Sequence, residues 1–283
     1  MHAVGFSRTA GALWRSSHPG PTLVVSVLTL ILGVSAGLDA GRLLLLVVAV
    51  FVGQLSVGWC NDAADARRDA AVGRGDKPIA GGEISARAVG VAAGVALTVA
   101  LLLTALFGPA LLVAHAVALA SAWSYNLVLK RTAASVVPFI VSFGLLPSFA
   151  TLALPTPAVA APWAGVAGAA LGVAVHFANV LPDLDDDAAT GVRGLPHRIG
   201  PRGSAVIAFG AVAVGALAVL LGPLITGASL SLVSVVGTIV VAVIAVVGLF
   251  RAVRRPDRTV FRLVMLAALV LAGTLALSGV SVV

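Results

Sequence analysis

Residues 42–60 read RLLLLVVAVFVGQLSVGWC, and NDAADARRD follows them directly at residues 61–69. The first run is apolar over almost its whole length, and about 20 such residues suffice for a helix to cross a bilayer core about 30 Å thick. The second run places one Asn and three Asp where that helix ends. This stretch therefore predicts a membrane-spanning helix that ends in a cluster of charged side chains.

Comparable apolar runs occupy most of the remaining chain. The other eight candidate spans are residues 22–38, 85–106, 109–128, 134–153, 160–180, 203–222, 229–249 and 259–282. Of the 283 residues, 60% are hydrophobic and only 10% are charged, whereas a soluble protein carries roughly a quarter charged residues. This composition excludes a soluble enzyme, a secreted domain and a disordered chain. We predict an all-α polytopic membrane protein, a single domain over residues 1–283 with about nine transmembrane helices.

Basic residues mark one side of the membrane. With nine spans, the N-terminal segment and the loops after the second, fourth, sixth and eighth spans hold all but Arg42 of the 18 Lys and Arg residues. Cytoplasmic segments carry such an excess, so we expect these segments in the cytoplasm. Because eight spans follow it, the run 22–38 is expected to stay as a helix rather than be removed as a leader. Topology also accounts for the formal charge of +7 without a nucleic-acid partner.

Acidic residues are concentrated on the same side. All but Asp39 and Asp257 of the 11 fall in two segments that follow the second and sixth spans. These segments contain Asp62, Asp65, Asp69, Asp76 and Glu83, and then Asp183, Asp185, Asp186 and Asp187. Acidic residues contribute little to membrane orientation, so the two clusters need another explanation.

The first cluster has the spacing of a metal site on a helix. If the second span continues as a helix, Asn61, Asp65 and Asp69 are four residues apart in turn and share one face. Carboxylates on one stripe repel each other unless a cation neutralises them. Hard oxygen ligands of this kind suit Mg²⁺, which is often shared with substrate phosphates. A stripe of this kind can therefore hold Mg²⁺, and two such stripes facing each other would hold two or more ions around a diphosphate.

The second cluster repeats this spacing. Asp183 and Asp187 are four residues apart, and Asn179 and His176 precede them on roughly the same side of the sixth span. Either cluster alone is equally consistent with a solvated face paired with nearby arginines. Two clusters at helix ends, on one side of the membrane and with one spacing, favour the metal interpretation.

Several basic and aromatic residues lie near the clusters. Arg74 and Lys77 follow the first cluster, Lys130 follows the fourth span, and Arg193 follows the second cluster. Lys and Arg can neutralise a departing diphosphate. The arginines after the eighth span, by contrast, are expected only to anchor the topology; they are Arg251, Arg254, Arg255 and Arg258.

Three further side chains are candidates for lining a cavity. Trp123 and Tyr125 lie about one turn before the basic residues that follow the fourth span, where their rings can face a cation. His176 lies deep in an apolar span, where a polar group is costly. His176 can therefore be interpreted in two ways: it lines the cavity near Asn179, or it is a packing residue whose polar atoms are hydrogen-bonded.

At these residues the chain resembles the UbiA superfamily of intramembrane prenyltransferases. The motif N-D-x-x-D-x-x-x-D of that family is complete at residues 61–69, and its basic-Pro stretch corresponds to Lys77-Pro78-Ile79-Ala80-Gly81-Gly82. Its loop after the fourth span corresponds to Tyr125-Asn126-Leu127-Val128-Leu129-Lys130-Arg131, and its second motif to Asp183, Asp187, Gly191 and Arg193. The chain departs from many members at Lys77, where they have Arg, and at His18-Pro19, where they have Arg-Pro.

The resemblance implies a fold and a reaction. The fold has nine helices around a central cavity, capped by cytoplasmic loops. The reaction transfers an isoprenyl group from an isoprenyl diphosphate to a lipophilic or aromatic acceptor, such as a quinone precursor, with Mg²⁺ as cofactor. We assign catalytic roles to Asp65, Asp183, Lys130 and Tyr125. Metal binding is assigned to Asn61, Asp62, Asp65, Asp69, Asp183 and Asp187, diphosphate binding to Lys77, Lys130, Arg74 and Arg193, and a cavity position to His176, Asn179 and Trp123.

Other functions remain open at the level of sequence. A terpene cyclase of the same fold would act on the diphosphate alone, and a transporter or lipid-binding protein would use the acidic stripes for ion coupling. The near-uniform Ala, Val, Leu and Gly helices do not specify the acceptor, the donor length, the number of metal ions or the oligomeric state. The usage of Ala, Val, Gly and Arg resembles that of GC-rich bacteria such as actinobacteria, so the expected location is the inner (plasma) membrane.

Overall fold

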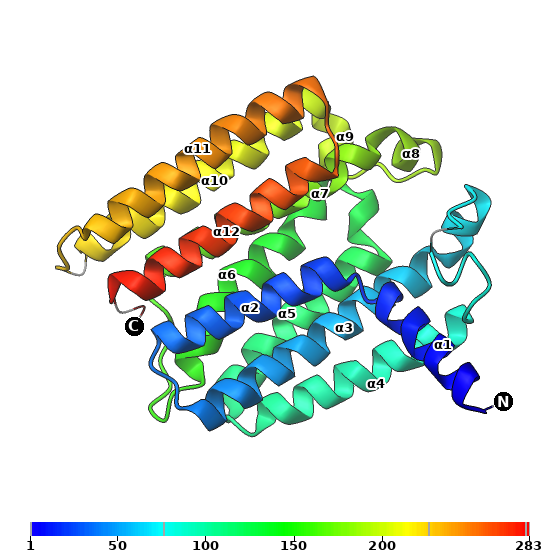
Figure 1. Cartoon of the computed structure of the whole chain (residues 1–283), viewed down its shortest axis with the longest axis horizontal. Helices are drawn as coiled ribbons and strands as arrows, with labels where there is room; N and C mark the ends of the chain where they lie inside the picture. Colours follow the sequence, from blue (N-terminus) through cyan, green and yellow to red (C-terminus); the bar gives the residue numbers. More distant parts are fainter. Residues whose placement is uncertain (1, 76, 226, 281, 283) are drawn as a thin grey trace.

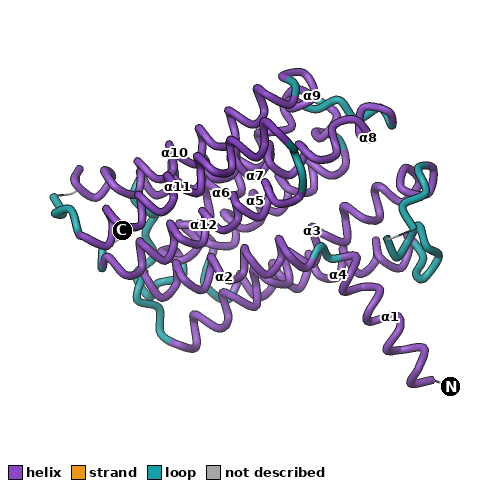
Figure 2. The backbone as a smooth tube through the Cα atoms, turned by 45° about the horizontal axis from the view of Figure 1, so that its top comes forward, coloured by secondary structure: helices purple, strands orange, loops and turns teal. Residues whose placement is uncertain are grey.

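The computed structural model describes residues 2–75, 77–225, 227–280 and 282, so Asp76 of the first acidic segment lies outside the described residues. Every regular element over these ranges is a helix, as Figure 2 shows, and the predicted all-α class is confirmed. The α-helices are α1 (His2–Ser16), α2 (Pro19–Ser35), α3 (Ala40–Ala71), α4 (Ala86–Ala105), α5 (Pro109–Leu127), α6 (Val137–Leu152), α7 (Pro162–Val180), α8 (Leu184–Ala189), α9 (Leu195–Ile199), α10 (Pro201–Ile225), α11 (Leu232–Arg254) and α12 (Arg258–Ser278). Three short 3-10 helices connect them: η1 (Leu129–Arg131), η2 (Ala133–Val136) and η3 (Leu181–Asp183).

The long helices correspond one for one to the predicted spans. In the described chain, eight helical segments are long and apolar enough to cross a membrane: α3, α4, α5, η2 with α6, α7 with η3 and α8, α10, α11 and α12. The ninth is α2 taken together with residues 8–16 of α1, from which it is separated by a 69° bend. The prediction of about nine spans is confirmed, and the chain is a multi-pass membrane protein.

Local sequence signals explain where these helices begin. The Asp39 carboxylate accepts hydrogen bonds from the N–H groups of Gly41 and Arg42 at 3.0 and 3.1 Å, and Asp257 accepts one from Thr259 at 2.8 Å. These caps satisfy N–H groups that the first turn of a helix leaves unpaired. The two acidic residues outside the clusters therefore cap α3 and α12.

The helices run side by side, so that their connections gather at the two ends of the bundle (Figure 1). The loop after α3, helices α8 and α9, and α1 all lie at one end, which we call the motif end. Helix α3 packs against α4 and α2, whereas α7 packs against α6, α10 and α12. Both acidic clusters therefore belong to the motif end, one at the end of α3 and one after α7.

Glycines allow α7 to approach α6 closely. A Cβ atom at Gly168 would lie 2.2 Å from the carbonyl oxygen of Phe143, and one at Gly172 would lie 2.3 Å from that of Phe139. Any side chain at these positions would collide with the backbone of α6. The two glycines therefore fix the distance between the two helices, and with it the position of Phe139 and Phe143, which line the cavity described below.

Gly172→Ala is expected to lower the free energy of unfolding by about 1–3 kcal/mol, because a backbone carbonyl cannot move aside as a flexible side chain can. Gly94→Ala on α4 is the matched control, since nothing lies within 4 Å of a Cβ at that position and Ala is the better helix former. Thermal unfolding in detergent compares the two variants. Equal transition temperatures would show that the helix contact tolerates the methyl group.

Candidate functional site

A cavity of about 700 Å³ opens among the charged residues at the motif end. It extends along the inner faces of α2, α3, α5, α6, α7 and α12. On α3 its lining runs from Val50 to Asp69, a length of about 28 Å at the rise of an α-helix. The deep part is mainly apolar and includes Val25, Leu146 and Phe149, with Gln54 and His115 as its polar members. The cavity thus joins a charged mouth to a chamber that suits a hydrocarbon chain.

Carboxylates of the first cluster are buried at the mouth. Asp62, Asp65 and Asp69 are only 2%, 3% and 3% exposed, although each carries an ionisable group. Helix α3 continues unbroken to Ala71, so the predicted shared face exists, and Asn61 lines the cavity with the three aspartates. Buried charges of one sign need partners in the protein or a bound cation.

Lys77 supplies one partner from the loop after α3. Its Nζ lies 3.1 Å from Asp62 Oδ1 and 2.9 Å from Asp69 Oδ2. Burial by itself lowers the pKa of Lys77, but the carboxylates of Asp62 and Asp69 outweigh burial and raise the pKa above its ordinary value. Lys77 is therefore a permanent cation at the mouth.

Lys130 supplies a second partner from η1. Its ammonium group donates a hydrogen bond to Asp65 Oδ1, and the side chain is buried. Burial lowers the pKa of Lys130, and Asp65 offsets part of this effect. The loop after the second cluster reaches η1 because residue 194 is glycine: a Cβ there would lie 2.7 Å from the Lys130 carbonyl oxygen.

Arg68 connects the two acidic clusters. Its guanidinium donates to Asp65 Oδ2 at 3.1 Å through Nη2 and to Asp187 Oδ1 at 3.3 Å through Nη1. Asp69 lies 3.8 Å from the same group. Arg68 was not among the residues predicted for the site, although its position three residues after Asp65 on the same helix was a usable signal.

The second cluster faces the cavity in part. Asp183, Asp186 and Asp187 line it, whereas Asp185 is exposed to solvent and lies outside the lining. Helices α7, η3 and α8 follow one another almost without interruption, which brings Asn179 into the lining as well. The structure therefore places both aspartate motifs on one cavity.

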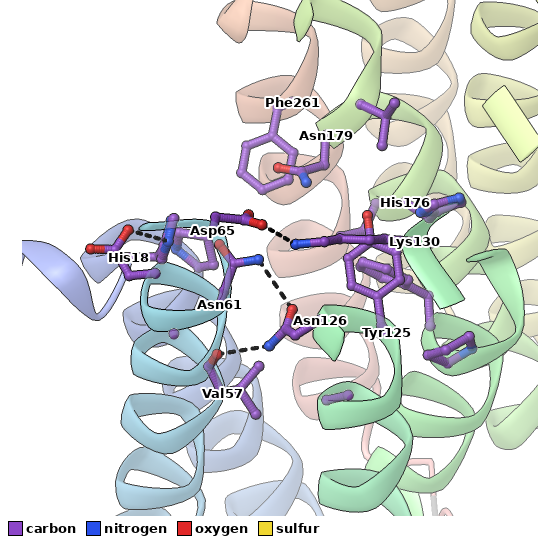
Figure 3. Close-up of a pocket in the computed structure, with 18 of the residues that line it drawn as sticks. His18, Val57, Asn61, Asp65, Tyr125, Asn126, Lys130, His176, Asn179 and Phe261 are labelled. Atoms are coloured by element: carbon purple, nitrogen blue, oxygen red, sulfur yellow. Dashed lines mark hydrogen bonds and ion pairs between the residues drawn. The ribbon is translucent and has the colours of Figure 1, made fainter. Parts of the chain in front are cut away.

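An aromatic and polar wall lies beside Lys130. Figure 3 shows Tyr125 and His176 on the side of the cavity opposite Asp65 and Asn61. The Tyr125 ring meets Phe139 edge to face at 4.9 Å between centroids, and His176 lies 5.7 Å away. His176 Nε2 shares a hydrogen bond of 3.1 Å with Ser135, whereas its buried Nδ1 has no partner in the described chain. His176 thus combines a packing contact with a place in the cavity.

Asn126 ties α5 to α3 at the same level. Its side-chain N–H donates to the Val57 carbonyl at 3.0 Å, and its oxygen accepts from Asn61 at 3.2 Å (Figure 3). Asn61 is oriented by this contact. Asn126 belongs to the loop motif after the fourth span, but the motif alone did not predict this role.

His18 reaches the first cluster from the bend between α1 and α2. It has a left-handed backbone with φ of 53°, and its Nε2 lies 3.8 Å from Asp62 Oδ1. The close approach depends on Gly58, because a Cβ there would lie 2.2 Å from the Ser17 carbonyl oxygen. Burial and then Lys77 lower the pKa of His18, against the opposing effect of Asp62. His18 therefore adds a neutral polar group to the mouth.

Two assigned residues do not line the cavity. The Trp123 indole donates to Ser56 Oγ at 3.0 Å instead, because residues two apart on a helix point in different directions and Tyr125 faces the cavity. Arg193 is exposed, while its neighbours Val192 and Gly194 form the lining. The remaining assigned residues all lie on the cavity, Arg74 among them.

The donor atoms around the mouth fit Mg²⁺. Among the described residues, no three His, Cys, Asp or Glu side chains form a ready-made coordination group. The buried Asp62 Oδ2, however, has no hydrogen-bond partner in the described chain, although a carboxylate oxygen at this depth requires one. Mg²⁺ prefers such oxygen donors and is usually completed by water and substrate phosphate. The residues therefore fit a metal that is shared with a phosphorylated ligand.

Comparison with known proteins agrees with this geometry. A model of the UbiA prenyltransferase family matches residues 20–280. No curated protein sequence matches the chain. Among solved structures, a UbiA homologue from Aeropyrum pernix in its apo form has a TM-score of 0.76 at 16% identity, with 92% of this chain and 98% of that chain covered. A UbiA homologue from Archaeoglobus fulgidus bound to GPP and Mg²⁺ has a TM-score of 0.72 at 13% identity, with 95% and 99% covered. A digeranylgeranylglyceryl phosphate synthase has a TM-score of 0.67 at 14% identity, with 96% and 97% covered.

Proposed function

The chain belongs to the UbiA prenyltransferase family, and from this premise we propose that it transfers an isoprenyl group from an isoprenyl diphosphate to a lipophilic or aromatic acceptor, with Mg²⁺ as cofactor. One observation carries the proposal. Two aspartate motifs from distant parts of the chain line the mouth of one cavity, and its deep part is mainly apolar. A diphosphate with a hydrocarbon tail matches both halves of such a cavity.

Metal binding is proposed at the two acidic clusters. The ligands come from Asn61, Asp62, Asp65 and Asp69 on α3 and from Asp183 and Asp187 after α7, all of which line the mouth. When bound, Mg²⁺ supplies Lewis-acid stabilisation of the diphosphate leaving group. The bound homologue from Archaeoglobus fulgidus, which holds GPP and Mg²⁺, supports this assignment.

The basic side chains bind the charge that develops on the diphosphate. In the proposed reaction the allylic C–O bond breaks, the electron pair leaves with the diphosphate, and a nucleophilic atom of the acceptor bonds to the allylic carbon and releases a proton. Lys77 and Lys130 point ammonium groups into the mouth, where they donate hydrogen bonds to the leaving oxygens. Charge-assisted hydrogen bonds of this kind are strongest where water is excluded.

The chamber protects the allylic cation from water. Tyr125 and Phe139 present aromatic rings beside Lys130, close to where the reacting carbon would lie. An aromatic face attracts a cation through its quadrupole. The apolar lining below them, which includes Leu119 and Leu146, holds the isoprenyl tail and keeps water away.

We propose that the motif end faces the cytoplasm of a bacterial cell. The support is the distribution of Lys and Arg, of which all but Arg42 lie on this side when the nine spans are numbered in order. The mouth would then receive its diphosphate from the cytoplasm, while a lipophilic acceptor would enter from the inner membrane.

The test measures product formation by the full chain in lipid nanodiscs. Radiolabelled isoprenyl diphosphates of several lengths are supplied with a panel of aromatic and lipid acceptors, with Mg²⁺ or with a chelator. We expect prenylated acceptor with Mg²⁺ and a loss of at least about 100-fold when the metal is removed, because its charge stabilisation is worth several kcal/mol.

Other products would identify other functions. A cyclised hydrocarbon or alcohol formed from the diphosphate alone would establish a terpene cyclase. Accumulation of an unreacted solute inside proteoliposomes, without any product, would establish a transporter. Turnover that is unchanged by the chelator would contradict the metal assignment.

A further inference from the structure

A basic stripe on α12 faces the cavity. Arg258, Phe261, Arg262 and Met265 all line it, and their spacing of three and four residues places them on one face of the helix. Figure 3 shows the Phe261 ring on this wall, on the same side of the Asp65–Lys130 pair as Asn179. The stripe starts with Arg258 at the motif end and alternates basic and apolar side chains as far as Met265.

Membrane topology does not explain this orientation. The positive-inside rule requires charge near the end of a span but does not select a face of the helix. The neighbouring arginines at the end of α11 behave as the rule predicts. They lie outside the cavity lining, with Arg251 paired to Asp257 at 2.6 Å and Arg254 stacked over Phe250 at 3.9 Å. Arg258 and Arg262 are exposed as well, so their place in the cavity lining is what distinguishes them. Arg258, interpreted from the sequence as such an anchor, lines the cavity instead.

Carboxylates of the cavity do not require these two arginines. Within the described part of the chain, neither Arg258 nor Arg262 has an ion-pair or hydrogen-bond partner. The buried carboxylates pair with Arg68, Lys77 and Lys130 instead. Two cations that line a cavity without partners there can bind an anion.

We propose that Arg258 and Arg262 bind an acid group, a carboxylate or a phosphate, on the isoprenyl acceptor. The inference rests on the proposed prenyl transfer and adds a substrate class to it. A guanidinium binds carboxylate or phosphate through two parallel hydrogen bonds, which fixes the orientation of the bound group. Phe261 and Met265, on the same stripe, contact the apolar part of the same molecule.

The donor diphosphate has its own partners elsewhere. Lys77, from the loop after α3, and Lys130, from η1, pair with aspartates of the first cluster, which is one of the two clusters where the metal is proposed. An acceptor anchored on the α12 wall by its acid group would place its ring beside the same mouth without competing for those lysines. At the start of α2 the lining includes His18 and Thr22, and the nearby cation Arg15 of α1 is paired with Glu83.

The experiment measures binding to the full chain in nanodiscs, so it does not depend on turnover. Isothermal titration compares 4-hydroxybenzoate with its methyl ester and glycerol 1-phosphate with glycerol. An unreactive farnesyl thiodiphosphate, added with Mg²⁺, reports the donor site. For wild-type protein we expect at least one anion to bind about tenfold more tightly than its neutral partner, since two guanidinium groups contribute charge-assisted hydrogen bonds. The pair that shows the difference tells carboxylate from phosphate.

The double variant Arg258→Gln/Arg262→Gln is expected to lose this difference and to keep thiodiphosphate affinity within about twofold, which also shows that it is folded. Arg254→Gln/Arg255→Gln removes two charges from the same segment and should bind as wild type. The proposal is overturned if acid and neutral probes bind equally to wild type, if both double variants behave alike, or if the first one loses thiodiphosphate binding instead. Absence of prenyl transfer alongside intact acid binding would contradict the proposed function alone.

Discussion

Replacing Asp65 with Asn is expected to reduce prenyl transfer by at least about 100-fold and to leave the protein folded. Asp65 occupies the centre of the charge network, since one carboxylate oxygen contacts Lys130 and the other contacts Arg68. Asn retains the shape and one acceptor oxygen but carries no charge to hold a metal or to orient the two cations. Losing one preorganised electrostatic contact in an active site commonly costs this much in rate.

The measurement is the steady-state rate of product formation at saturating donor and Mg²⁺. Asp185→Asn is the matched control, because Asp185 belongs to the second cluster yet lies outside the cavity lining. It should retain the wild-type rate. A wild-type rate in Asp65→Asn, at an unchanged Mg²⁺ requirement, would show that the first motif does not bind the metal.

Arg68→Met is expected to damage both stability and turnover. Arg68 is the contact between the two motifs, and its removal leaves Asp65 and Asp187 without a shared cation. Removing one partner of a buried ion pair lowers the free energy of unfolding by about 3–5 kcal/mol. Because Arg68 is partly exposed at 21% of its side chain, we expect about 2–3 kcal/mol of destabilisation after solvent screening. Turnover is expected to fall at least about tenfold as the second motif loses its position.

The adjacent residue supplies the control. Arg67 is exposed and does not line the cavity, so Arg67→Met removes the same charge from the same turn of α3 without breaking the contact. Thermal unfolding and turnover are compared for the two variants. Arg68→Lys should recover only part of the loss, since an ammonium group cannot bridge two carboxylates with the fork of a guanidinium. Equal behaviour of Arg67→Met and Arg68→Met would show that Arg68 does not connect the motifs.

Hydrophobic periodicity and charge placement predicted the fold in its main features. The nine apolar runs correspond in order to α2, α3, α4, α5, α6, α7, α10, α11 and α12. The apolar run of the second span ends near Cys60, and α3 continues beyond it to Ala71 as one helix, which the shared face of Asn61, Asp65 and Asp69 requires. A hydropathy run ends where charge begins, but a helix can continue into water when its polar face is paired.

Spacing rules predicted which acidic residues share a face, and the structure brings them to one cavity. The spacing did not predict which residue pairs with each charge. Arg68 and His18 enter the site through contacts between elements, and His18 reaches Asp62 only because Gly58 admits the backbone of Ser17. Contacts of this kind depend on helix packing, which a single sequence does not specify. The metal and catalytic assignments themselves stay predictions for the variants to test.

Trp123 and Arg193 show the limit of arguing from proximity in sequence. Both lie within a few residues of side chains that line the cavity, yet Trp123 bonds Ser56 and Arg193 is exposed outside the lining. For Trp123 the reason is helical, because a displacement of two residues from Tyr125 turns a side chain by more than half a revolution. Arg258 and Arg262 are the opposite case: they are far in sequence from both acidic clusters, yet α12 places them in the cavity lining.

Helix α3 carries the deep apolar lining and the whole first motif on one uninterrupted rod, from Val50 to Asp69. An insertion of one residue anywhere between these points would rotate everything beyond it by about 100° and turn the carboxylates away from the mouth. A deletion would do the same in the opposite sense. The chain length within α3 is thus as strongly constrained as the identity of the aspartates, whereas length changes can be accommodated in the connection at residues 72–85. Sequences that diverge from this one are expected to gain or lose residues there and to keep the register of α3 intact.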